Sequence, residues 1–84
     1  MKSPDMMSIE MAQVAERAPQ GSRWQHLKSG AEYSVFGHCF LEANAGPAIL
    51  YALSAEGEHP LWARPASEFL DGRFVRCPEL PHPL

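Results

Sequence analysis

The sequence predicts a mainly β fold, a small five-stranded barrel that follows an N-terminal amphipathic α-helix. Apolar residues recur at helical spacing over residues 4–18, and after Gly21 the pattern changes to short strand-like runs separated by turns. Five such runs follow, with one helical turn before the last, which is the order of elements in SH3-like barrels. Closing so small a sheet into a barrel removes its exposed edge strands, and an open, strongly bent sheet is the alternative.

The predicted helix has start and stop signals at its two ends. Ser3 suits the N-cap position and Pro4 suits the first helical position, while Pro-Gln-Gly at residues 19–21 stops the helix. Its apolar face carries Met7, Met11, Val14, Ala15 and Ala18. Because a single amphipathic helix is marginally stable alone, this face must pack on its own domain, on a second copy or on a partner protein.

The strand-like runs are short and bounded by turn residues. They span residues 23–27, 32–41, 48–53, 61–64 and 73–77. Strict alternation in the second run places Tyr33, Val35, Cys39 and Leu41 on one face, and Phe36 and Phe40 on the other with Ser34 and His38. A strand that is apolar on both faces is expected to be covered on both. Residues 66–70 are predicted to form one helical turn that places Phe69 and Leu70 against the sheet.

A chain of 84 residues has room for one domain and no second core. We divide it into a helix at 1–20, the β domain at 21–77 and a proline-rich tail at 78–84 that is a poor candidate for regular structure. Its two cysteines, Cys39 and Cys77, are typical of a reduced cytosolic protein. No secretory signal is evident, and no apolar run approaches the roughly 20 residues of a membrane span. These features predict a soluble, cytoplasmic protein.

Residue spacing gives little support for a metal site or for catalysis. The candidate ligands show no Cys-x-x-Cys or His-x-x-x-His spacing; they are His26, His38, Cys39, His59, Cys77 and His82. The nearest pair of carboxylates, Glu56 and Glu58, falls in a polar loop, and the six glycines form no phosphate-binding loop. We predict no cofactor and no metal, and we favour a binding protein over an enzyme. The net charge of −3 gives no support for binding to duplex nucleic acid.

The densest side-chain information lies in residues 61–70. Trp62 and Arg64 are two residues apart and therefore share a face of a strand. They could form a cation–π pair, or flank the ring or the anionic group of a ligand. Alternatively, Trp62 belongs to the core and Arg64 pairs with Glu68 or with backbone carbonyls. The predicted binding surface consists of Trp24, His26, Lys28, Tyr51, Trp62 and Arg64.

Several short runs together resemble domain-of-unknown-function family 1653, a family of small bacterial and phage-associated proteins. The runs are Gly-Ser-Arg-Trp-Gln-His-Leu-Lys-Ser-Gly at 21–30, Tyr-Ser-Val-Phe-Gly at 33–37, Leu-Tyr-Ala-Leu at 50–53, Leu-Trp-Ala-Arg-Pro at 61–65, and Phe69. The resemblance covers residues 21–70 and carries over His26, Lys28, Gly37, Tyr51, Trp62, Arg64, Pro65 and Phe69. Residues 41–44, Leu-Glu-Ala-Asn, lack the histidine that the family commonly has there. The resemblance supports the fold and implies no established activity.

The sequence thus predicts a small binding or adaptor module of bacterial or phage type. One alternative is a nucleic-acid-binding accessory protein that uses Trp24, Lys28, Trp62 and Arg64, since stacking and a few cations suffice for single strands. Another is an enzyme subunit that needs a partner chain. The apolar helix face and the two-sided second strand also predict a protein partner or a homodimer. The expected interface is Met7, Met11, Val14, Phe36 and Phe40.

Overall fold

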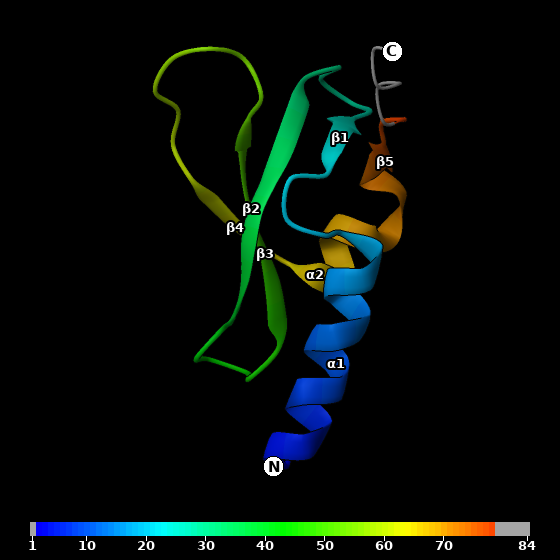
Figure 1. Ribbon diagram of the computed structural model, residues 1–84, viewed down its shortest axis with the longest axis vertical. Helices are drawn as coiled ribbons and strands as arrows, with labels where there is room; N and C mark the ends of the chain where they lie inside the picture. Colours follow the sequence, from blue (N-terminus) through cyan, green and yellow to red (C-terminus); the bar gives the residue numbers. More distant parts are fainter. Residues whose placement is uncertain (1, 79–84) are drawn as a thin grey trace, which may run out of the picture.

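Five antiparallel strands form one sheet, and a helix packs on its concave face in the computed structural model, which describes residues 2–78 (Figure 1). The mainly β prediction with an N-terminal helix is therefore confirmed. In chain order the elements are α1 (Pro4–Arg17), β1 (Arg23–His26), β2 (Glu32–Phe40), β3 (Pro47–Leu53), β4 (Trp62–Pro65), α2 (Ala66–Glu68), the π-helical turn η1 (Phe69–Arg73) and β5 (Phe74–Arg76). Most of the predicted tail lies outside the described residues.

The sheet is open, so the prediction of a closed barrel is wrong. The strand order is β4-β3-β2-β1-β5, and the two edge strands do not pair with each other. The chain between them is taken up by α2 and η1, β4 ends at Pro65, which has no backbone N–H to donate, and β5 has only three residues. Too little extended backbone is left at the two edges to complete a ladder.

The open sheet is nevertheless strongly curved. In a flat sheet β3 and β5 would lie about 14 Å apart, three strand spacings. The rings of Tyr51 on β3 and Phe74 on β5 have centroids only 5.5 Å apart. The curvature brings the two edges of the sheet toward each other, and the side chains of β4 and β5 meet across the concave face.

A β-bulge in β2 changes which residues share a face. The β2–β3 register pairs Val35 with Tyr51 and then shifts, which leaves Phe36 as the extra residue. Beyond the shift, His38 pairs with Ile49. Tyr51 and Ile49 are two residues apart on β3 and share its concave face, so Val35 and His38 lie on that face together.

Strict alternation along β2 is therefore contradicted beyond Val35. Cys39 pairs with Ala48 and lies on the face opposite to Val35, whereas Phe40, opposite Pro47, lies on the same face as Val35. The predicted faces of β2 fail at this point because one inserted residue reverses the inward and outward positions that follow it.

The core is built from aromatic rings that meet across the curved sheet. Its buried members are Val14, Ala18, Trp24, Val35, Ile49, Tyr51, Ala66, Phe69 and Phe74. Phe69 is fully buried and stacks on Phe74 with ring centroids 4.3 Å apart. Leu70 packs against the same cluster, so the prediction that the helical turn places Phe69 and Leu70 against the sheet is confirmed.

The helix α1 covers its own sheet. The Ser3 hydroxyl accepts a hydrogen bond from the Met6 N–H at 3.2 Å, which confirms the predicted N-cap. Val14 is buried and Met11 packs against the core. At the other end His38 Nε2 donates to the carbonyl of Ala18 at 2.6 Å and satisfies an otherwise orphaned helix carbonyl. Val14, a member of the predicted interface, thus packs within its own chain.

The remaining residues of the expected interface differ in exposure. Met7 is half-buried, Phe36 is 57% exposed and Phe40 is 37% exposed. The helix thus leaves the two β2 phenylalanines partly uncovered. No helix within residues 2–78 has the length and apolar character needed to cross a membrane.

Candidate ligand-binding cleft

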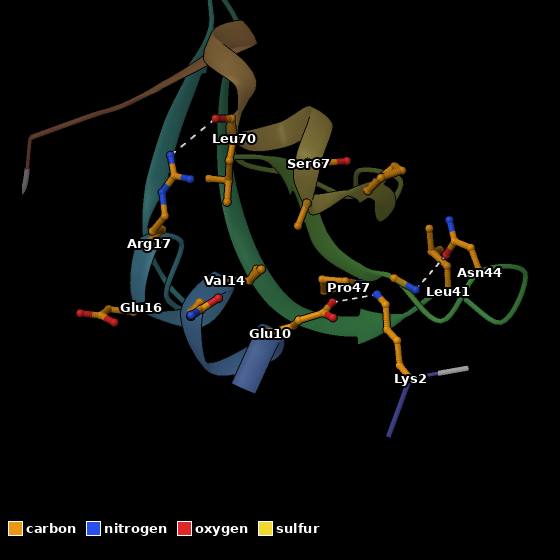
Figure 2. Close-up of a pocket in the computed structure, with 14 residues that line it drawn as sticks. Lys2, Glu10, Val14, Glu16, Arg17, Leu41, Asn44, Pro47, Ser67 and Leu70 are labelled. Carbon is orange, nitrogen blue, oxygen red and sulfur yellow. Dashed lines mark hydrogen bonds and ion pairs between the residues drawn. The ribbon is translucent and has the colours of Figure 1, made fainter. Parts of the chain in front are cut away.

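Two of the surface cavities formed by residues 2–78 are large enough to consider as ligand sites. The larger, about 840 Å³, lies between α1, α2 and the turn that joins β2 to β3 (Figure 2). Val14 and Leu70 contribute apolar surface to it. At its margins Lys2 pairs with Glu10 at 2.8 Å, and Arg17 donates to the Leu70 carbonyl at 3.5 Å (Figure 2). The charged side chains of its lining are two cations, Lys2 and Arg17, and two carboxylates, Glu10 and Glu16, so this cavity has no excess charge that would favour an ionic ligand.

The smaller cavity, about 520 Å³, is the candidate site, and we call it the basic cleft. Its lining residues are His26, Leu27, Lys28, Arg64 and Arg73. Four of the five carry basic side chains, on a chain whose net charge is −3. They come from three parts of the chain: the end of β1 and its following turn, strand β4, and the residue before β5. The cleft thus forms where curvature brings the two edges of the open sheet together.

Arg64 is held in place before any ligand is present. Its Nε donates to the Tyr51 hydroxyl at 3.1 Å, and its guanidinium carbon lies 5.6 Å from the centre of the Phe74 ring. The hydrogen bond to Tyr51 raises the pKa of Arg64 above its ordinary value, and desolvation opposes this in part. Within residues 2–78, Nη2 of Arg64 has no hydrogen-bonding partner, so this group remains able to bind an anion.

Two carboxylates neutralise part of the positive charge around the cleft. Glu68 is shared between Arg64 at 3.5 Å and Arg73 at 3.2 Å, and Asp71 pairs with Arg73 at 3.0 Å. With Lys28 included, three permanent cations face two carboxylates, an excess of one positive charge. These ion pairs are solvent-exposed and contribute little to stability, so an incoming anion can replace them at small cost.

Backbone hydrogen bonds fix the wall of the cleft formed by the β1–β2 turn. Gly30 takes a positive φ of 76° and donates to the His26 carbonyl at 2.7 Å. Leu27 N–H donates to the Arg73 carbonyl at 3.0 Å, which ties this turn to the chain before β5. Lys28 and Arg73 are thereby carried on two segments that cannot separate without loss of this contact.

The turn also contains a histidine–serine contact. His26 Nδ1 lies 2.9 Å from Ser29 Oγ, but the same hydroxyl accepts the Ala31 N–H at 3.2 Å. The serine oxygen thus accepts a backbone hydrogen bond that stabilises the turn. We therefore assign the pair to the structure of the turn rather than to nucleophilic catalysis.

Trp62 stands beside the basic cleft without lining it. It is 52% exposed, so the alternative that placed it in the core is wrong. It pairs in register with Tyr51 on β3, and it shares the concave face of β4 with Arg64. The tryptophan stays exposed because β4 is an edge strand, with a neighbouring strand on one side only.

The six predicted binding residues separate into two groups. His26, Lys28 and Arg64 meet at the basic cleft, and Trp62 lies next to it. Trp24 and Tyr51 are buried, so their prediction as surface residues is wrong. The buried pair still supports the site: the Tyr51 hydroxyl holds Arg64, while Trp24 packs edge-on against Phe69, with its indole N–H donating to the Ser22 hydroxyl at 3.0 Å.

Sequence reasoning missed Arg73 and Leu27. Arg73 follows Gly72, whose positive φ of 107° turns the chain from η1 into β5. The sequence offered one signal for Arg73. It is a cation directly after a glycine turn, and that turn follows the strand that carries Arg64. Leu27 carries no such signal, because its place at the cleft depends on the backbone contact to Arg73.

Other chemistry is sparse in the part of the chain that the structure describes. Within residues 2–78 no three His, Cys, Asp or Glu side chains gather to hold a metal ion. Cys39 and Cys77 are both free thiols and half-buried.

Comparison of the chain with protein-family models, with curated proteins and with solved structures finds no match. The candidate site is therefore interpreted from its own geometry and chemistry.

Proposed function

We propose that the protein is a binding module whose ligand places an anionic group in the basic cleft. The observation that carries this proposal is the meeting of Lys28, Arg64 and Arg73 around one cavity on an otherwise acidic chain. Like charges gathered from three segments repel one another unless a counter-charge is present, and two partly exposed carboxylates supply only part of it. An anionic ligand supplies the rest.

Preorganisation of Arg64 favours binding. A guanidinium that is already oriented by a hydrogen bond to Tyr51 and by the Phe74 ring loses little conformational freedom when it binds an anion. Hydrogen bonds between a guanidinium and an oxyanion are among the stronger ones in proteins. Arg64 is thus the residue expected to contribute most to affinity.

The test is calorimetric titration of the full chain with pyrophosphate. Arg64→Met removes the charge but keeps a long apolar side chain, and it should lower the affinity about tenfold, or about 1.4 kcal/mol. Lys2→Gln removes one positive charge just before α1, outside the lining of the basic cleft, and serves as the control that keeps the affinity unchanged. Absence of pyrophosphate binding, or an equal loss in both variants, would contradict the proposal.

We also propose that the fold is SH3-like and that the chain is related to domain-of-unknown-function family 1653. The strand order β4-β3-β2-β1-β5, with a helical turn between β4 and β5, supports an SH3-like arrangement that has remained open. The matched motif residues His26, Lys28 and Arg64 meet at the basic cleft, which supports the resemblance to domain-of-unknown-function family 1653. We also propose a protein–protein interaction role, which the 57% exposure of Phe36 supports.

A further inference from the structure

We propose that the ligand is a free nucleotide, with its phosphates in the basic cleft and its base stacked on Trp62. This inference rests on the proposed function, because it assigns the chemical class of the anion that the cleft binds. It joins two observations: the cationic lining of the cleft, and an exposed indole on the same strand face as the best-oriented cation.

The phosphate part follows from the donors at the cleft. The planar guanidinium groups of Arg64 and Arg73 match the oxygens of a phosphate in a two-pronged geometry, and Lys28 adds a mobile point charge. Arg64 Nη2 faces no protein acceptor among residues 2–78, so one donor is free without breaking any contact. The cavity volume of about 520 Å³ lies within the range for sites that hold small molecules.

The base part follows from the position of Trp62. Two residues along a strand separate Trp62 from Arg64, about 6.6 Å at the usual rise. A ligand that extends from the guanidinium along β4 toward Trp62 therefore comes within reach of the exposed indole. Trp62 is 52% exposed, so much of its apolar surface is in contact with water. A base stacked on the indole would bury part of that surface, which is favourable. Base–aromatic stacking contributes about 1–3 kcal/mol and tolerates any base.

The charge of the chain and of the cleft favours a free nucleotide over a polynucleotide. A polynucleotide gains most of its affinity by neutralising many phosphates along a basic surface. This chain has a net charge of −3 and an excess of one positive charge at a single cleft. That arrangement suits the two phosphates of a nucleoside diphosphate and disfavours an extended polyanion.

The experiment titrates the full chain with pyrophosphate, ADP and UDP by calorimetry. We expect both nucleotides to bind about tenfold more tightly than pyrophosphate, in keeping with one stacking contact. Trp62→Ala should abolish this gain and leave pyrophosphate binding intact, whereas Trp62→Tyr should retain most of it. Leu61→Ala, at a neighbouring residue that is 56% exposed, is the matched control and should leave all affinities unchanged.

The outcomes separate this inference from the proposed function. If pyrophosphate binds and the nucleotides bind no more tightly, the nucleotide inference is overturned and the anion site stands. The same holds if Trp62→Ala leaves the nucleotide gain intact. If neither pyrophosphate nor nucleotides bind, both are overturned. In a further arm, a single-stranded oligonucleotide of about ten residues that binds more tightly than ADP would identify nucleic acid as the ligand and overturn the free-nucleotide source.

Discussion

Two buried side chains, Tyr51 and Phe74, hold the guanidinium of Arg64 in a fixed orientation at the surface. Tyr51 is only 6% exposed, yet its hydroxyl reaches Arg64 and aligns the guanidinium over Phe74. A residue of the core thus controls the geometry of a residue at the surface.

Tyr51→Phe should reveal this control. The ring remains in the core, so we expect the free energy of unfolding to fall by about 1 kcal/mol, the usual contribution of one hydrogen bond. Pyrophosphate affinity should fall several-fold because Arg64 is no longer held. Tyr33→Phe is the matched control, since Tyr33 packs against Tyr51 and Phe74 but its hydroxyl makes no hydrogen bond within residues 2–78. Equal losses of affinity in the two variants would contradict the assignment.

The raised pKa of Arg64 determines how this contact depends on pH. A cation whose pKa is higher in the folded state than in the unfolded state stabilises the fold at every pH below both values, and the stabilisation is lost only as the pH rises through them. Both values lie far above neutrality. The difference in unfolding free energy between wild type and Tyr51→Phe should therefore be constant from pH 5 to pH 9 in chemical denaturation. A marked change across that range would show that another group titrates with the contact.

The two tryptophans are expected to differ strongly in their contribution to stability. Trp62→Ala should change the free energy of unfolding by about 0.5 kcal/mol or less, because the side chain is half exposed on an edge strand. Trp24→Ala should cost about 3–5 kcal/mol, because it removes a buried ring that packs on Phe69. Thermal melting of both variants provides the comparison. A severe loss with Trp62→Ala would return that residue to the core.

The helix α1 covers the concave side of the sheet. Its N-cap at Ser3, its buried Val14 and its C-terminal contact from His38 to Ala18 fix it at both ends and at the middle. The outward residues Met6 and Ile9 are 53% and 58% exposed, so the helix has an uncovered apolar edge as well.

Val14→Asp tests whether α1 is held by this packing. A buried, unpaired carboxylate should destabilise the docked helix by more than about 3 kcal/mol and expose the core beneath it to a hydrophobic dye. Met6→Asp introduces the same charge on the exposed side of α1 and should change neither stability nor dye binding appreciably. Dye binding that is equal in the two variants would show that the helix covers nothing essential.

Self-association of the molecule stays a prediction, and the structure indicates which residues of the predicted interface are accessible to a second copy. Val14 and Met11 pack within one chain, so the members of the predicted interface that remain accessible are the half-buried Met7 and, on β2, Phe36 and Phe40. Phe36 is exposed because it is the extra residue of the bulge.

Light scattering over a concentration series measures this directly. A dimer should give a mass near twice 9.3 kDa, and Phe36→Asp should shift it toward the monomer without loss of the β-type spectrum. Ile9→Asp, on the exposed side of α1, is the control. A mass near 9.3 kDa at every concentration would end the dimer hypothesis.

The local structure could be predicted from the sequence, because helix caps, turns and strand-like runs depend on neighbouring residues. Ser3 and Pro4 marked the start of the helix, and Pro19 to Gly21 marked its end. The five strand-like runs all became strands, and the run after Pro65 became the predicted helical turn that buries Phe69.

The contacts between side chains from distant parts of the chain could not be predicted from the sequence. The bulge at Phe36 arises from the pairing of β2 with β3, and alternation along one strand cannot reveal an inserted residue. The exposure of Trp62 depends on the sheet remaining open, which leaves β4 at an edge. Arg73 joins Arg64 because the sheet curves through contacts far apart in the sequence. Such contacts depend on how the strands pack in space, and the spacing of residues along the chain does not carry that information.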